Sequence, residues 1–569
     1  MVFSKSIQPT LKILMSKGFE QLLFLPLGGS GEIGMNLNLY SYDNQWVMVD
    51  CGISFADEYL PGIDLIMADP IFVDNIKDNL KGLVLTHAHE DHIGAVVHLW
   101  PKFKCPIYAT PFCALILKSK LKDAGLLDLA TIHEVPLKGV INLGDFEIEY
   151  VTLTHSIPEP NALRITTPLG TIFHTGDWKI DPAPVIGAAT DENRLKEIGD
   201  AGVLAIVCDS TNVFNKKSSG SETAVRKSLV ELLQAKEGAI FCATFSSNVA
   251  RLDTLSHVAK STDRHLCLVG RSIKRNIAAA RECGYLKGFP TILSEQDAAH
   301  IPRHKILYIC TGCQGESRAA LMRIINDNNK YVHITGSDTV VFSSKIIPGN
   351  ELSITRMHNA LIEKSAEVIT EKNAFVHVSG HPGQDELKQM YEWIRPEIIV
   401  PTHGERAHLI KQAEFARSLG FKKTVVPHNG SVIKLAPGKA EIINEVKTGR
   451  LVLDGSILIR DDDMAIVERR RIQSNGSLVV YVIMDDKGIL LTPLNIITNG
   501  LPEKKPKELV NFIKDKIHQA LELAVTKGVK DDDDLKELIR RSARKASKYY
   551  TGKETGPVTT ITILRIGKK

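Results

Sequence analysis

The residues best suited to chemistry form one short cluster, Thr86–His92 (THAHEDH). It directly follows the apolar run Gly82–Leu85, which predicts a buried strand. Alternate side chains of an extended segment point to the same side, so His87 and His89 can face one ion. A lone histidine is more often structural than ligating, whereas several groups that zinc accepts, gathered at one strand end, predict a metal site. The candidate ligands are His87, His89, Asp91 and His92.

Three further candidate ligands lie far along the chain, each just after a predicted strand: His155, Asp177 and His403. Two adjacent metal ions need more ligands than the first cluster supplies. The added residues complete two three- or four-coordinate sites, with Asp177 in a position to bridge them. Hydrolysis is the chemistry that such a site favours, because two metal ions activate water and stabilise both oxygens of a displacement.

The elements that must position these residues are short strands ended by Gly, Pro, Asp or His. A helix is expected to begin near Ile93, directly after the first cluster. From about residue 221, helical patterns alternate with apolar strands, which predicts a second α/β domain with parallel pairing. Strand-then-histidine patterns resume at Ala374–His381 and Ile398–His403, so the second domain interrupts the first. Strands of the first third are expected at Gln21–Pro26, Asn36–Tyr42, Trp46–Asp50, Gly82–Thr86, Phe146–Thr154 and Thr171–His174.

A third region follows residue 449. Strands are expected up to Leu491, and then two helices at Lys507–Thr526 and Asp534–Tyr550 and a closing strand at Thr559–Leu564. The predicted fold class is therefore α/β with a small α+β domain at the C-terminal end. The predicted organisation is a split first domain at 1–215 and 371–448, an inserted domain at 216–370, a linker at 449–465 and a C-terminal domain at 466–569.

Composition sets broad limits. With 569 residues, 43% hydrophobic and 24% charged, the chain is too long for one core and has the composition of a soluble globular protein. Its net charge of +4 is weak evidence for any partner. No apolar run approaches the ~18 residues of a membrane helix. The amphipathic residues 1–21 lack a signal peptide's apolar stretch and predict a short capping helix, so a cytoplasmic protein without a membrane partner is expected.

Two patterns indicate structure and not chemistry. The nine cysteines are an odd number scattered through a long chain, which predicts reduced, mostly buried thiols, and the single CxxC, Cys310–Cys313, has no second pair. Gly29–Gly34 fits the dinucleotide-binding pattern G-x-G-x-x-G. The alternating segment Met35–Tyr42 after it predicts a strand where that motif requires a helix, so a tight glycine turn is expected.

The histidine cluster, together with His155 and Asp177, resembles the metallo-β-lactamase superfamily. Asp50, in VDCG, is similar to the aspartate of the superfamily's first motif, which orients the metal-binding region. The resemblance implies an αββα sandwich that binds two zinc ions, with Mn²⁺ or Mg²⁺ as alternative ions. It assigns His87, His89 and His155 to one zinc, Asp91, His92 and His403 to the other, and Asp177 to both.

The inserted domain narrows the resemblance. Asp209 in CDSTN, His381 in SGH and His403 resemble three further motifs of the β-CASP nucleases, and a histidine at the third is typical of the branch that cuts RNA. Further stretches resemble the ribonuclease J family, among them LGGSGEIG (27–34), HSIP (155–158) and HVSGH (377–381). The resemblance implies 5′-to-3′ exonuclease and endonuclease action on single-stranded RNA in RNA maturation and decay. It also implies a homodimer or homotetramer, with the C-terminal domain as a candidate interface.

Catalysis then needs a group that protonates the ribose 3′-oxygen as it leaves. Asp209 and His381 are the candidates, with Asp91 as a further catalytic residue, and a role of His381 as a phosphate clamp is the alternative. His174, beside Asp177, is expected to fix the orientation of a metal ligand by a hydrogen bond.

Substrate contacts are predicted at two segments. The first segment offers backbone amides, a hydroxyl and two imidazoles around a phosphate, and it consists of His377, Val378, Ser379, Gly380 and His381. The second offers a ring for base stacking and two hydroxyls, and it consists of Phe245, Ser246 and Ser247. The family resemblance implies a 5′-monophosphate pocket around such residues, although Phe245 could instead be a core residue.

The basic run Lys536–Lys553 fits a solvated helix face, an RNA contact or a subunit interface, and the acidic run Asp531–Asp534 before it fits a helix N-terminus.

Two other functions remain as alternatives. An ester or thioester hydrolase of the same superfamily would share the histidine cluster, but it would not need the inserted domain, His381 or His403 in these contexts. A non-catalytic RNA-binding scaffold would have lost metal ligands, and none is missing from this sequence. Activity on a thioester without activity on RNA, or a purified protein that binds no metal, would distinguish these alternatives from a nuclease.

Overall fold

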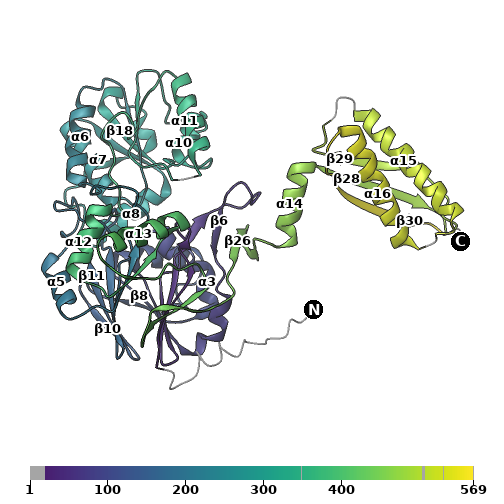
Figure 1. Cartoon of the computed structure of the whole chain (residues 1–569). Helices are drawn as coiled ribbons and strands as arrows, with labels where there is room; N and C mark the ends of the chain where they lie inside the picture. The colour runs from purple at the N-terminus through teal and green to yellow at the C-terminus, as the bar shows by residue number, and fades with distance from the viewer. Residues whose placement is uncertain (1–19, 348, 503–505, 530, 568–569) are drawn as a thin grey trace. The chain divides into compact units, whose positions relative to one another are not determined.

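The computed structural model describes residues 20–347, 349–502, 506–529 and 531–567. The capping helix predicted for residues 1–21 lies almost entirely outside them. The chain divides into two compact units. Of the described residues, the first unit contains 20–55 and Leu65–Arg450, coloured from purple to green in Figure 1, and the second contains 56–64, in purple, and the green to yellow part after Arg450.

The first unit contains two large sheets that pack against each other. The first has eight strands in the order β25-β24-β1-β3-β4-β7-β8-β9. The second has seven in the order β10-β11-β12-β13-β14-β21-β23. The first sheet's bounds are β1 Leu22–Gly28, β3 Leu37–Tyr42, β4 Gln45–Val49, β7 Leu80–Val84, β8 Ile107–Ala109, β9 Ile132–Glu134, β24 Ser431–Ala436 and β25 Glu441–Glu445. The second sheet's bounds are β10 Val140–Leu143, β11 Phe146–Thr152, β12 Asn161–Thr167, β13 Gly170–His174, β14 Ala205–Asp209, β21 Ile398–Thr402 and β23 Lys423–Thr424.

One buried core lies between the two sheets. Phe24, Tyr40 and Val84 of the first sheet pack there with residues of the second. On β14, Ala205 and Val207 belong to this core, whereas the intervening residues face helices on the outer side. Such alternation is what a strand buried on both faces requires. The helices of these layers are α2 Glu90–Ile93, α3 Val96–Phe103, α4 Pro111–Asp123, α5 Glu192–Asp200, α12 Gln384–Ile394 and α13 Arg406–Ser418.

The predicted αββα sandwich is confirmed by this layering. α5, α12 and α13 share a buried core with the outer face of the second sheet, and α4 contacts β8 and β9 of the first. The short strands β2 Ser30–Gly31 and β22 Gly404–Glu405 pair with each other, as do β5 Ile53–Phe55 and β6 Leu65–Ala68. The glycine turn was predicted correctly, because Gly29 has φ +81° and the segment after it is strand β3.

The inserted domain is a six-stranded, all-parallel sheet in the order β17-β16-β18-β15-β19-β20 (Figure 1). Its strands are β15 Ile240–Ala243, β16 His265–Val269, β17 Ile292–Leu293, β18 Ile306–Cys310, β19 Thr339–Phe342 and β20 Glu367–Ile369. Parallel strands need crossover connections, which the helices supply. They are α6 Glu222–Gln234, α7 Val249–Ser261, α8 Arg271–Glu282, α9 Glu295–Ala298, α10 Ala320–Ile325 and α11 Glu351–Glu363.

Two local expectations for the first unit were wrong. Residues 374–381 are not a strand, because they have no ladder partner, and the carbonyl of Val376 accepts from side chains instead. The helix expected near Ile93 begins earlier, at Glu90, so Asp91 and His92 lie within its single turn.

The second unit contains a three-stranded sheet, β29-β28-β30, and two long helices. Apolar residues on one face of β28 pack with both helices. The acidic run lies at the N-terminal end of α16, as predicted, and Asp531 caps the helix by accepting hydrogen bonds from the amides of Asp533 and Asp534. A helix between residues 464 and 475 was not predicted, since its hydrophobic periodicity is weak. The bounds are β26 Arg450–Asp454, β27 Ile457–Arg460, α14 Met464–Asn475, β28 Ser477–Met484, β29 Asn495–Asn499, α15 Pro506–Thr526, α16 Asp532–Thr551 and β30 Val558–Arg565.

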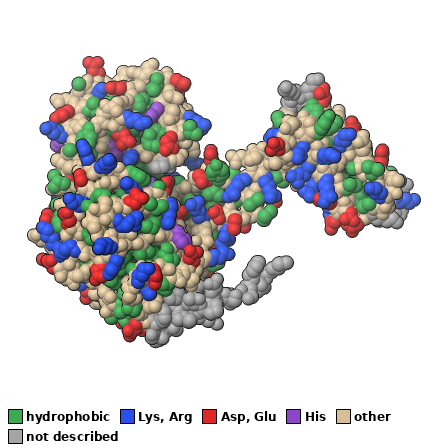
Figure 2. All heavy atoms as spheres, viewed as in Figure 1, with side chains coloured by type: hydrophobic (Ala, Val, Ile, Leu, Met, Phe, Trp, Pro, Cys, Tyr) green, Lys and Arg blue, Asp and Glu red, His purple; other side chains and the backbone are tan. Residues whose placement is uncertain are grey.

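Two global properties complete the description. None of the helices in the described part of the chain is both long and apolar enough to cross a membrane. All nine cysteines are free, and burial raises the pKa of Cys313 to about 12, so the CxxC pair holds thiols and not thiolates. Figure 2 shows acidic and basic side chains interspersed over the visible face of the first unit.

Candidate metal centre

Strand ends bring the predicted ligands together. β13, β14 and β21 are parallel neighbours, so the residues that follow them lie at the same edge of the second sheet. β7 of the first sheet ends just before the histidine cluster. The structure thereby gathers all seven residues predicted from the sequence as ligands into two overlapping groups: His87, His89, His155 and Asp177, and Asp91, His92, His403 and Asp177.

In the first group, three imidazole nitrogens converge on one point. Nδ1 of His89 lies 3.0 Å from Nε2 of His87 and 3.0 Å from Nε2 of His155. Nitrogen ligands of a tetrahedral zinc ion are separated by roughly 3.3 Å. Oδ2 of Asp177 lies 3.8 Å and 3.7 Å from Nε2 of His87 and of His155. The donor set therefore fits a zinc ion.

The second group lies on the other side of Asp177. Oδ1 of Asp177 is 3.2 Å from Nε2 of His92 and 3.5 Å from Nε2 of His403. Oδ2 of Asp91 is 3.7 Å and 3.6 Å from the same two nitrogens. Oδ1 of Asp177 and Nε2 of His403 are buried and accept or donate no hydrogen bond within the protein. Buried polar atoms without partners are costly, so these atoms fit a cation between them.

The charges of the two groups suit a cation as well. Burial lowers the pKa of His87 and His155 well below the usual value and that of His89 to about 4, so these imidazoles are neutral, as metal ligands must be. Burial also lowers the pKa of His92, but Asp177 and Asp50 raise it by more. For Asp177, burial raises the pKa, while His403 and His92 lower it by more. The second group thus carries one buried carboxylate, that of Asp177, and one partly exposed carboxylate, that of Asp91, which attract positive charge.

Asp50 lies directly behind the second group. Its Oδ2 is 2.7 Å from Nδ1 of His92, and it also accepts hydrogen bonds from the amide and hydroxyl of Thr86. An acceptor at Nδ1 selects the tautomer whose Nε2 is free to bind a metal ion. Asp50 has φ +62°, a left-handed conformation that is uncommon for a residue other than glycine.

Asn36 was missed by the sequence analysis. The oxygen of its side-chain amide lies 3.1 Å from Nδ1 of His403, and its Nδ2 donates to the carbonyl of Asp91 at 3.1 Å. A Cβ on Gly29 would lie 2.4 Å from Oδ1 of Asn36, so the glycine turn makes room for this amide. The available signal was weak, because Asn36 is one of three polar residues in Met35–Tyr42, together with Asn38 and Ser41.

The hydrogen bond that the structure gives His174 is to Tyr40, which is not one of the predicted metal ligands. Nδ1 of His174 lies 2.8 Å from the hydroxyl of Tyr40, in the buried layer between the two sheets. Burial lowers the pKa of His174 to about 4, so it is neutral. The side chain of His174 faces the first sheet, and its pairing with Tyr40 depends on how the two sheets pack, which no local sequence pattern indicates.

The two candidate catalytic residues are paired. Nδ1 of His381 lies 2.8 Å from Oδ2 of Asp209, whose Oδ1 accepts from the amide of Thr211. Burial lowers the pKa of His381, but Asp209 and Asp177 raise it by more, to about 9. Because Nδ1 of His381 is hydrogen-bonded to Asp209, its Nε2 is the nitrogen that can donate a proton or contact a phosphate. Asp209, His381, His403 and Asp177 also form a third group of convergent donor atoms.

One predicted substrate segment, His377–His381, adjoins the metal ligand His155. The carbonyl of Gly380 is 2.6 Å from Nδ1 of His155, and a Cβ at this glycine would lie 2.7 Å from the same ring. The hydroxyl of Ser379 accepts from the amide of His381. Phe245 is half-buried against the core of the inserted domain, as its alternative interpretation proposed.

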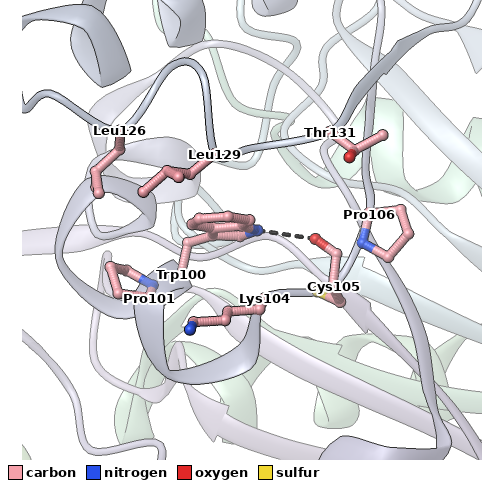
Figure 3. A pocket seen from close by; sticks show the side chains of 8 residues that line it. All are labelled: Trp100, Pro101, Lys104, Cys105, Pro106, Leu126, Leu129 and Thr131. Atoms are coloured by element: carbon pink, nitrogen blue, oxygen red, sulfur yellow. Dashed lines mark hydrogen bonds between the residues drawn. The ribbon is translucent and has the colours of Figure 1, made fainter.

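Two other predicted features lie away from the metal centre. In the basic run of α16, Lys536 pairs with Asp533, and Arg540 and Arg541 pair with Glu537, so this half of the run is locally neutralised. A separate cavity of about 240 Å³, lined by Trp100 and Leu129 among others, lies before the N-terminal ends of β8 and β9 (Figure 3). The metal centre follows the C-terminal end of the parallel strand β7, so this cavity is at the opposite edge of the sheet.

Comparison with known proteins agrees with this geometry. Four family models match in succession: a beta-lactamase superfamily domain at 45–195, the ribonuclease J beta-CASP domain at 237–361, a zinc-dependent metallo-hydrolase RNA specificity domain at 365–427, and the ribonuclease J C-terminal domain at 464–566.

Curated relatives match over nearly the whole chain. Ribonuclease J of Sinorhizobium meliloti is 43% identical over 96% of this chain and 98% of its own length. Ribonuclease J of Helicobacter pylori (strain ATCC 700392 / 26695) is 33% identical over 92% and 76% of the two chains. A crystal structure of a protein of unknown function from Enterococcus faecalis matches 73% of this chain and all of its own, with a TM-score of 0.51 and 16% identity, a likeness of fold alone.

Proposed function

The chain belongs to the ribonuclease J family of zinc-dependent ribonucleases, and we propose that it uses two zinc ions to cut RNA from the 5′ end and internally. The observation that carries this proposal is the carboxylate of Asp177. One of its oxygens faces the imidazoles of His87 and His155, and the other faces those of His92 and His403. Such a carboxylate suits a bridge between two ions.

We assign the first zinc to the histidines on one side of Asp177 and the second to the residues on the other. When bound, two zinc ions lower the pKa of a water molecule towards ~7 and neutralise charge on the phosphoryl oxygens. The residues that hold them are His87, His89 and His155 for the first, Asp91, His92 and His403 for the second, and Asp177 for both. Mn²⁺ or Mg²⁺ are the candidate substitutes.

His381 then serves the leaving group. Its imidazolium, held by Asp209, donates a proton from Nε2 to the ribose 3′-oxygen as the P–O bond breaks. The buried carboxylate of Asp209 fixes the ring and stabilises its positive charge, as a carboxylate does behind a catalytic histidine. Asp91 would contribute as a ligand of the second metal ion.

The 5′-end preference is assigned to two segments of the chain, residues 245–247 and 377–380. Backbone amides and the hydroxyls of Ser246, Ser247 and Ser379 suit a 5′-monophosphate, which accepts several hydrogen bonds. His377 adds a neutral imidazole, because burial lowers its pKa well below the usual value. An RNA held by its first phosphate is cut near that end, and one that bypasses the pocket is cut internally.

The decisive experiment compares His89→Ala and Asp91→Ala with the unchanged enzyme. Both variants should lose cleavage and lose bound zinc, while binding of single-stranded RNA is retained because the substrate segments are intact. RNAs with 5′-triphosphate, 5′-monophosphate and 5′-hydroxyl ends, labelled at each terminus, would reveal the direction of cutting. Undiminished cleavage by both variants would contradict the proposed metal centre.

We further propose that two copies associate through the C-terminal sheet. α15 and α16 cover one face of this sheet. The other face exposes Tyr481, Ile497 and Leu564, by 39%, 45% and 52% of their surfaces. The strand register places all three on that same face. Exposed apolar side chains on one sheet face are typical of an interface.

Replacing Tyr481 and Leu564 with Glu should yield monomers in sedimentation experiments, and an unchanged mass would contradict this interface.

A further inference from the structure

Arg251 is fully buried in the inserted domain, with 0% of its side chain exposed. It lies in the first turn of α7 and forms an ion pair with Glu222, the first residue of α6. Nε donates to one carboxylate oxygen at 3.1 Å, and Nη2 lies 3.0 Å from both. A buried arginine is costly unless its charge is paired and all its N–H groups are used.

The remaining nitrogen of Arg251 reaches two backbone carbonyls. Nη1 donates to the carbonyl of Ser343 at 2.9 Å and to that of Val376 at 2.9 Å. The hydroxyl of Ser343 also donates to the carbonyl of Val376, at 2.7 Å. Val376 directly precedes His377, the first residue of one predicted substrate segment. The guanidinium therefore anchors the start of that segment, which has no strand partner to hold it.

The same arginine is tied to the other substrate segment. The carbonyl of Ser343, to which Nη1 donates, also accepts from the hydroxyl of Thr244, next to Phe245. The backbone amide of Arg251 donates to Oδ1 of Asn248 at 2.8 Å, and the amide of Asn248 donates to the carbonyl of Phe245. Both halves of the proposed 5′-phosphate pocket are thus fastened to one buried side chain.

The network also extends toward the metal centre. The amide of Glu222 donates to Oδ2 of Asp181 at 2.9 Å. The amide of Asp181 donates in turn to the hydroxyl of Thr154, the residue before His155. Lys179, two residues after Asp177, pairs with Asp181 at 3.3 Å. These contacts start from the backbone amide of Glu222 and not from its carboxylate, so they do not depend on the Arg251–Glu222 ion pair.

We propose that Arg251 is a positioning residue that sets the spacing of the two halves of the 5′-phosphate pocket, and so the preference for 5′-monophosphate ends. The inference rests on the proposed function of residues 245–247 and 377–380. Arg251 does not itself bind the phosphate, because it has no exposed surface and each of its guanidinium nitrogens already donates within the protein. Its effect is on geometry, and it should act on 5′-end recognition and not on the hydrolytic step.

The test removes both charges together. Arg251→Met alone would leave Glu222 as an unpaired buried carboxylate, so the variant is Arg251→Met with Glu222→Met, which keeps the volume. Three RNAs of one sequence are compared: a linear 5′-monophosphate, a linear 5′-hydroxyl and a circle without ends. The ratio of kcat/KM for 5′-monophosphate over 5′-hydroxyl RNA should fall to about a tenth of the unchanged enzyme's, mainly through KM. Cleavage of the circle should stay within about two-fold.

A matched control lies on the same two helices. Arg226 of α6 pairs with Asp253 of α7, and no hydrogen bond joins that pair to either pocket segment. Arg226→Met with Asp253→Met should leave the 5′-end ratio unchanged. The proposal is overturned if the folded Arg251–Glu222 double variant keeps the original ratio, or if it loses activity on the circle as much as on the linear monophosphate.

A smaller change guards against a variant that fails to fold. Ser343→Ala removes a single hydroxyl that links Arg251 to the carbonyl of Val376. It should lower the 5′-end ratio by about three-fold while thermal unfolding changes little. An unchanged ratio in folded Ser343→Ala would count against the proposal. An unchanged enzyme without any 5′-monophosphate preference would instead overturn the proposed pocket itself.

Discussion

Oδ2 of Asp50 lies 2.7 Å from Nδ1 of His92, on the side of the ring that faces away from Asp177. This contact leaves Nε2 of His92 directed at the second group of ligands. Asp50→Asn should therefore lower zinc affinity by about 10- to 100-fold, the usual effect of losing a carboxylate behind a histidine ligand. Zinc titration followed by elemental analysis would measure the change.

The surface variant Asp123→Asn is the control for Asp50→Asn. Asp123 pairs only with Arg275, and its side chain is 64% exposed. This variant should bind zinc as the unchanged protein does. If Asp50→Asn binds zinc with unchanged affinity, then the hydrogen bond does not orient His92, and the carboxylate serves the backbone turn at Thr86 alone.

Asn36 should matter for only one of the two proposed ions. Its amide contacts His403 and the carbonyl of Asp91, and no hydrogen bond joins it to His87, His89 or His155. Asn36→Leu keeps the size of the side chain and removes its hydrogen bonds. We expect about one zinc per chain to be lost at limiting metal, with affinity for that ion lowered roughly ten-fold. Loss of both ions together, or of neither, would contradict this assignment.

The metal centre was largely predictable from the sequence because its ligands follow strands. His87, His155 and His403 each end an apolar run, and the ends of parallel strands meet at one sheet edge. Asn36 and the partner of His174 were not predictable in this way. Each depends on which residue stands opposite on another strand, and that register is set by long-range packing.

The larger errors have a similar origin. Residues 374–381 have the composition of a strand, but the carbonyl of Val376 accepts from Arg251 and Ser343, residues that are far away in the sequence. α14 was missed because few of its residues are buried, so no apolar stripe marks it. The position of Asp531–Asp534 at the N-terminal end of α16 was predicted correctly, because it depends only on neighbouring residues.

His381→Gln should slow the chemical step while the zinc content is retained. The imidazolium that we propose as the proton donor is lost, and general acid catalysis contributes about 100- to 10,000-fold. Asp209→Asn should have a smaller effect in the same direction, because it removes only the carboxylate that holds the ring. Single-turnover cleavage and elemental analysis would measure both quantities. A His381→Gln protein that lacks zinc would show that this histidine is a ligand.

Glu149 gives the fold a pH dependence of known sign. Burial raises the pKa of its carboxyl, but Arg194 and Arg164 lower it by more, so the net shift is downward. The unfolded chain has the ordinary value of about 4.3. The ion pairs therefore stabilise the fold above that pH, and this contribution is lost as the pH falls through the lower folded value. Glu149→Gln should unfold at a lower urea concentration than the unchanged protein at pH 7, and this difference should shrink toward pH 4.

Glu197→Gln provides the comparison for Glu149→Gln. Glu197 pairs with the same Arg194, but its side chain is 63% exposed, and exposed ion pairs contribute little to stability. Its substitution should shift the urea midpoint only slightly at either pH. If Glu149→Gln shows the same difference at pH 7 and pH 4, the loss comes from packing of the side chain between Arg164 and Arg194 and not from its charge.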